Sequence, residues 1–113
     1  MKQPDVRLLH TDGCSPENTE AARAALEAAL AGVGMPVDAY QVILIRTEEE
    51  AVDQGFVGGP AIMVNGVDVD PVVRDMRTGG LGCRAYITAD GLTGAPPVEM
   101  IEAALREAGG QSG

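Results

Sequence analysis

Thr11-Asp12-Gly13-Cys14-Ser15-Pro16-Glu17 is the stretch that decides the fold, because the spacing of apolar residues changes there. Before it, residues 5–10 form a short apolar run that predicts a buried strand. After it, apolar side chains recur at helical spacing to about residue 31. Ser15 is a favoured N-cap residue and Pro16 suits the first helical position. The sequence therefore predicts a strand that leads through a thiol-bearing turn into a helix.

Cys14 falls immediately before the predicted helix N-terminus. The unpaired N–H groups and the positive end of the helix dipole at such a position favour the thiolate over the thiol. Glu17 places a negative charge in the first turn and opposes this effect on the thiol. Free cysteine is also commonly a small buried hydrophobe. A nucleophile and a packed core residue are therefore both open interpretations of Cys14.

The next part of the chain completes a βαβ unit. Tyr40 to Arg46 is a nearly continuous apolar run, which predicts a central strand covered on both faces. We expect this strand to lie parallel to the first, because a helical crossover connects the two. Thr47 and Glu50 form a capping-box pattern that predicts a helix over residues 48–54, and Gly55 is a suitable C′ residue.

The sequence of the second half of the chain predicts a hairpin, an extra strand and a C-terminal helix. Asn65-Gly66 between Ala61–Val64 and Val67–Val69 is a strong antiparallel hairpin signal. Cys83 to Thr88 predicts a small further strand, and Val98 to Ala108 an amphipathic helix. We expect one α/β domain over residues 1–113, with an ordered core at about 5–108. Its central four-stranded mixed sheet is flanked by helices, with a loop and strand insertion before the last helix.

Composition excludes several classes of partner. The 113 residues carry 8 basic and 17 acidic side chains, a net charge of −9, which opposes binding to nucleic acid or anionic lipid. No apolar run reaches the length of a membrane span, and the N-terminus lacks a signal-peptide pattern. A cytoplasmic protein is expected. The two cysteines form neither a disulfide scaffold nor a zinc-finger spacing.

Three further motifs carry a family resemblance. They are Asp12-Gly13-Cys14, then Gly55-Phe56-Val57-Gly58-Gly59-Pro60, then Gly80-Leu81-Gly82-Cys83-Arg84-Ala85-Tyr86 with the following Asp90-Gly91-Leu92-Thr93-Gly94-Ala95-Pro96-Pro97. Together they resemble the thioredoxin superfamily, and more narrowly a group of small bacterial thioredoxin-like proteins, some of them labelled alkylmercury-lyase-like. The resemblance covers nearly the whole chain. It implies a thioredoxin-like fold with Cys14 at the nucleophile position and Pro60 at the cis-proline position. It also implies that Gly59 offers backbone groups to a bound chain. We expect Ser15 to belong to the same substrate-binding site as Gly59 and Pro60.

This chain departs from the thioredoxin pattern at one decisive position. Glu17 stands where the second cysteine of a Cys-X-X-Cys motif is expected, so the usual neighbouring thiol cannot resolve a mixed disulfide. Cys83 can fill that role if the glycine-rich loop before it folds back over Cys14, and we then expect a Cys14–Cys83 disulfide. Arg84 would supply positive charge for a thiolate or an anionic substrate. The alternative is that Cys83 is a packed strand residue and Arg84 lies in solvent.

Two functional hypotheses follow from these residues. The first is a thiol-disulfide oxidoreductase or thiol-transfer protein, with Cys14 as nucleophile, Cys83 as resolving thiol and Gly59-Pro60 as docking edge. Its substrate would be a protein or small-molecule thiol or disulfide, and no cofactor is expected. The second is a module without redox catalysis, which docks a partner or holds mercury or copper on Cys14 and Cys83, helped by Glu17 or His10.

Overall fold

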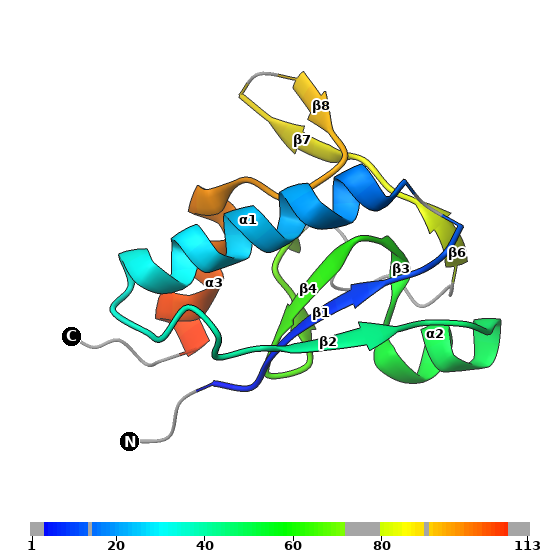
Figure 1. Ribbon diagram of the computed structural model, residues 1–113, viewed down its shortest axis with the longest axis horizontal. Helices are drawn as coiled ribbons and strands as arrows, with labels where there is room; N and C mark the ends of the chain where they lie inside the picture. The colour runs from blue at the N-terminus through cyan, green and yellow to red at the C-terminus, as the bar shows by residue number, and fades with distance from the viewer. Residues whose placement is uncertain (1–3, 14, 72–79, 90, 109–113) are drawn as a thin grey trace.

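The computed structural model describes residues 4–13, 15–71, 80–89 and 91–108 (Figure 1). It contains the three expected helices, which are α1 (Pro16–Gly32), α2 (Glu48–Gln54) and α3 (Val98–Ala108). The strands are β1 (Val6–His10), β2 (Gln41–Leu44), β3 (Val57–Gly59), β4 (Ala61–Val64), β5 (Val67–Asp68), β6 (Gly80–Cys83), β7 (Tyr86–Thr88) and β8 (Gly91–Thr93).

A four-stranded mixed sheet in the order β2-β1-β4-β5 forms the centre of the molecule. β1 pairs parallel with β2, as the helical crossover through α1 predicts, and antiparallel with β4. β5 is antiparallel to β4 and therefore runs in the direction of β1. β1 and β5 thus end at the same end of the sheet, and Pro60 precedes β4 there. The predicted α/β class with a four-stranded mixed sheet is confirmed.

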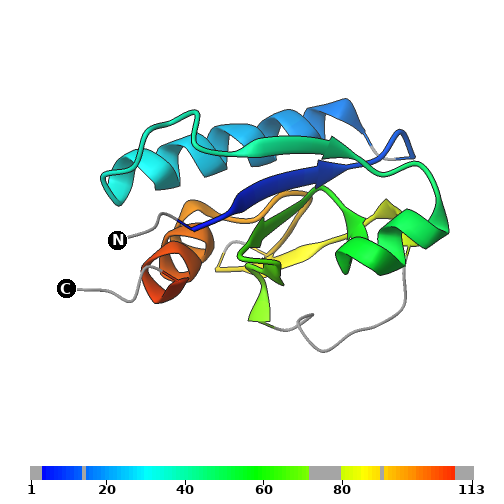
Figure 2. The same ribbon diagram turned by 90° about the horizontal axis from the view of Figure 1, so that it is seen from below.

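Helices cover both faces of this sheet, and the alternation of side chains along β1 separates them. Leu8 packs into a cluster with α1 and α3, whereas Leu9 packs with Ala51 of α2 and with Phe56 on the other face. Figures 1 and 2 show α1 and α3 side by side, with α2 following the end of β2. All four of these side chains are apolar and fully buried, so burial supplies the main stabilisation on both faces.

Local sequence signals set the helix and turn boundaries. The Ser15 hydroxyl accepts from the Glu17 N–H at 3.2 Å and caps α1. Both bonds of the capping box between Thr47 and Glu50 are present, and Gly55 ends α2 in the left-handed conformation with a φ of 71°. Asn65 (φ 54°) and Gly66 (φ 79°) make the turn between β4 and β5. The acidic residues at the start of α2 therefore include a structural cap.

Two predictions about strands are wrong. β2 is an edge strand and not a central one, and its Val42 side chain is 44% exposed. The predicted strand over Cys83–Thr88 is instead two strands, because β6 ends at Cys83 and β7 begins at Tyr86 in a separate hairpin with β8. Arg84 lies between them and forms the buried ion pairs described below.

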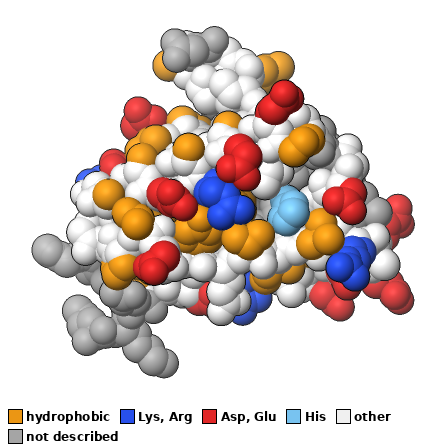
Figure 3. Space-filling view, in the orientation of Figure 1, with side chains coloured by type: hydrophobic (Ala, Val, Ile, Leu, Met, Phe, Trp, Pro, Cys, Tyr) orange, Lys and Arg blue, Asp and Glu red, His pale blue; other side chains and the backbone are white. Residues whose placement is uncertain are grey.

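The molecular surface reflects the acidic composition. In the face shown in Figure 3, small groups of hydrophobic side chains alternate with acidic ones, and basic side chains are fewer. Among the residues that the structure describes, no helix combines the length and apolarity needed to cross a membrane.

Candidate functional site

The segments of interest meet around Gly59 and Pro60, joined by a cis peptide bond as predicted. β3 pairs in parallel with β6, so that Gly59 lies opposite Cys83. The Arg84 N–H donates to the Gly59 carbonyl at 3.2 Å. Thr11, which follows β1, is also close, because a Cβ built on Gly59 would lie 3.6 Å from its Cγ2. The end of β1 and the end of β6 therefore both lie against Gly59.

Arg84 is held in a buried ionic cluster. Its Nη1 lies 2.6 Å from Oδ2 of Asp68 and its Nη2 lies 3.1 Å from Oδ1, which makes a bidentate pair. Asp70 contributes a second carboxylate 3.6 Å from Nη2. The three side chains are between 4% and 9% exposed. Burial by itself would lower the pKa of Arg84, but the hydrogen bonds to Asp68 and the neighbouring negative groups raise it above its ordinary value.

Tyr86 links this cluster to the cis bond. Its hydroxyl donates to the Pro60 carbonyl at 2.6 Å, and the Arg84 guanidinium carbon lies 4.3 Å above the centre of its ring. The side chain is fully buried. Burial raises the pKa of Tyr86 well above its ordinary value, although the nearby Arg84 charge acts in the opposite direction. The phenol therefore stays protonated and remains a donor to Pro60.

The structure places most of the predicted site residues at this end of the sheet. Gly59, Pro60 and Arg84 contact one another directly or through Tyr86, and the backbone of Cys83 pairs with Gly59. The interpretation in which Arg84 lies in solvent is wrong, because its side chain is only 7% exposed. The Gly59 carbonyl, expected to serve a bound chain, is bonded to the protein itself.

The turn before α1 is described on either side of Cys14. The Gly13 N–H lies 3.5 Å from the Thr11 hydroxyl oxygen, and the Ser15 hydroxyl donates to the Glu17 carboxylate at 2.9 Å. Cys14 itself lies outside the described residues. The predicted Cys14–Cys83 disulfide therefore stays a prediction.

Sequence reasoning missed Tyr86, Asp68 and Asp70. A signal for the two carboxylates exists, because alternate residues of a strand and its extension share one face, and a buried acidic pair needs a cation. No short-range sequence signal indicated which basic residue supplies that cation, because the insertion before the last helix separates Arg84 from Asp70 in the sequence. The partner of Tyr86 is likewise a backbone carbonyl that is distant in the sequence.

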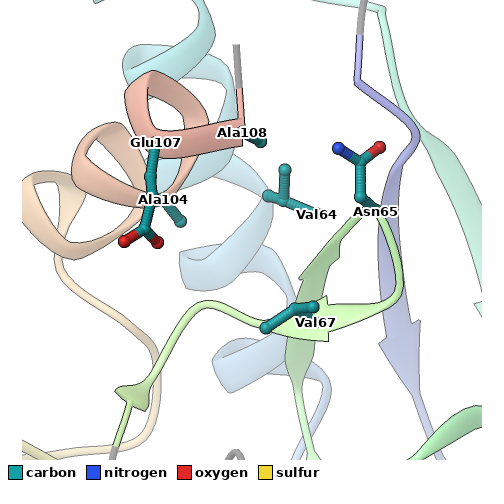
Figure 4. Close-up of a pocket in the computed structure, with 6 residues that line it drawn as sticks. All are labelled: Val64, Asn65, Val67, Ala104, Glu107 and Ala108. Carbon is teal, nitrogen blue, oxygen red and sulfur yellow. The ribbon is translucent and has the colours of Figure 1, made fainter. Parts of the chain in front are cut away.

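A separate groove lies at the opposite end of β4. Figure 4 shows it between α3 and the β4–β5 hairpin, where it has a volume of about 280 Å³. Its lining combines four small aliphatic side chains with one carboxamide and one carboxylate, and consists of Val64, Asn65, Val67, Ala104, Glu107 and Ala108. Asn65 follows β4 whereas Pro60 precedes it, so this groove is distinct from the Gly59–Pro60 region.

Neither a metal-binding group among the described residues nor a similar protein assigns a function to this site, so its interpretation rests on the chemistry of its residues. Within the described ranges, no group of three or more His, Cys, Asp or Glu side chains is placed to hold a metal ion. The sequence matches no protein-family model, and no curated protein or solved structure shows significant similarity to it.

Proposed function

We propose that the protein is a thioredoxin-like thiol-disulfide oxidoreductase or thiol-transfer protein, with Cys14 as nucleophile and Cys83 as resolving thiol. The observation that carries this proposal is the pairing of Gly59 with Cys83 at the end of the sheet where β1 ends and α1 begins. The segments that bear the two cysteines therefore approach the same glycine.

The sheet and the helix cap support the same assignment. The order β2-β1-β4-β5, with only β4 reversed, agrees with the strand directions expected of a thioredoxin-like sheet. α1 is a helix of 17 residues with a capped N-terminus directly after Cys14, where its dipole favours a thiolate.

The proposed reaction proceeds by two thiol–disulfide exchanges. The Cys14 thiolate attacks one sulfur of a substrate disulfide, which forms a mixed disulfide and releases a thiolate that takes a proton from water. The Cys83 thiolate then attacks the Cys14 sulfur and releases the second half of the substrate. The substrate gains two electrons and the protein becomes a Cys14–Cys83 disulfide, which an external thiol must reduce before the next cycle.

Two single substitutions test this mechanism. With bis(2-hydroxyethyl) disulfide, the wild-type protein should lose two thiols and gain no mass adduct, and Cys83→Ser should stop at an adduct on Cys14. Cys14→Ser should neither lose thiols nor form an adduct. Intact-protein mass spectrometry and thiol titration measure these outcomes. Reaction that survives the loss of Cys14, in a variant whose circular dichroism matches the wild type, refutes the proposal.

A further inference from the structure

The strand edge beside Pro60 is already occupied by the protein's own chain. β6 pairs with β3, the Arg84 N–H bonds to the Gly59 carbonyl, and the Tyr86 hydroxyl bonds to the Pro60 carbonyl. Pro60 has no N–H to offer. An extended polypeptide that binds by strand addition needs unpaired backbone groups along an edge. At Gly59 and Pro60 both carbonyls are already engaged within the chain.

The segment that occupies this edge is also firmly anchored. The guanidinium of Arg84 is almost fully buried between Asp68 and Asp70 and packs over the Tyr86 ring. Withdrawal of Arg84 from this cluster would break its ion pairs with two buried carboxylates, which is strongly destabilising. A docking polypeptide would have to supply that free energy before it made its first hydrogen bond to Gly59.

Building on the proposed thiol function, we infer that the substrate is a small-molecule disulfide or thiol, and that extended polypeptides are excluded from pairing at Gly59 and Pro60. A small disulfide needs only access to the reacting sulfur and gains nothing from a strand edge. A polypeptide disulfide loses the backbone pairing that would otherwise favour it. The Arg84 cluster thus acts as a specificity determinant through the position of β6.

The kinetic test compares two disulfides by the reaction in which the Cys14 thiolate releases 2-mercaptoethanol from each. One is bis(2-hydroxyethyl) disulfide, and the other is an uncharged extended peptide, blocked at both ends, whose one cysteine is joined to 2-mercaptoethanol. Second-order rate constants for adduct formation are measured with the Cys83→Ser variant. We expect the peptide to react no faster than the small disulfide. A peptide advantage of about tenfold or more, equivalent to about 1.4 kcal/mol of binding, overturns the inference.

A second measurement decides whether the edge is closed without any thiol chemistry. Amide hydrogen exchange at Arg84 is followed in the wild-type protein, with and without excess of the same peptide carrying serine in place of cysteine. Unchanged exchange is expected, and faster exchange at Arg84 on peptide addition overturns the inference. If neither disulfide modifies Cys14, the proposed function is refuted, while this measurement still determines whether β6 excludes the peptide.

The role of the ionic anchor is tested by Asp68→Asn, with Asp5→Asn as the control. Both changes remove one carboxylate from an ion pair with arginine, but Asp5 pairs with Arg7 at an exposed position. Asp68→Asn should accelerate exchange of the Arg84 amide and raise the peptide-to-small-disulfide rate ratio, whereas Asp5→Asn should change neither. Equal behaviour of the two variants would contradict the anchoring role.

Discussion

Replacement of Tyr86 by phenylalanine tests the link between the ionic cluster and the cis bond. The substitution removes only the hydroxyl, whose oxygen lies 2.6 Å from the buried Pro60 carbonyl, and keeps the ring under Arg84. A buried acceptor that loses its donor costs about 1–3 kcal/mol. We therefore expect Tyr86→Phe to lower the free energy of unfolding by about 2 kcal/mol, which for a chain of this length corresponds to a Tm lower by about 8 °C.

Urea unfolding followed by far-UV circular dichroism, with reductant present, is the appropriate assay because the chain has no tryptophan. Tyr40→Phe is the matched control. Its hydroxyl donates to Glu27 at 2.7 Å and accepts from Arg23 at 3.1 Å, but it is only partly buried, so water can replace these bonds. If Tyr86→Phe costs no more than Tyr40→Phe, the structural role assigned to the Pro60 hydrogen bond is incorrect.

Three further predictions concern the same region and its supports. Because burial raises the pKa of Tyr86, the folded protein holds this proton more tightly than the unfolded chain does. The contribution of this proton to the free energy of unfolding is fully present below the ordinary tyrosine pKa of about 10. Above that pH it decreases by about 1.4 kcal/mol per pH unit. The urea midpoint should therefore fall less steeply with rising alkaline pH in Tyr86→Phe than in the wild type. Gly59→Ala would place a methyl group 3.0 Å from Cζ of the buried Phe56 ring, and it should cost about 1–3 kcal/mol in urea unfolding; an unchanged midpoint would show that the ring yields freely. Thr47→Ala removes the hydroxyl that accepts a hydrogen bond from the Glu50 N–H in the capping box, and it should lower the free energy of unfolding by about 1 kcal/mol. An equally stable variant would mean that α2 does not depend on this cap.

The sequence by itself determined the local elements, because their signals are short-range. The helix after Ser15, the capping box at Thr47 and the Asn65-Gly66 hairpin each depend on residues within a few positions of one another. The bounds of α3, Val98–Ala108, also agree with those predicted from apolar spacing. These signals, together with the crossover rule, were sufficient for an α/β fold with a mixed sheet.

Tertiary structure alone decided the strand order at the edges and the composition of the candidate site. The apolar run of β2 did not reveal that, within the described part of the chain, one of its sides has no neighbouring strand, since apolarity indicates burial and not pairing. Likewise, an arginine such as Arg84 is usually exposed to solvent. Its burial becomes favourable here because the carboxylates of Asp68 and Asp70 lie next to its guanidinium. Contacts of this kind join segments far apart in the chain, and their free energy exists only once the intervening elements have packed.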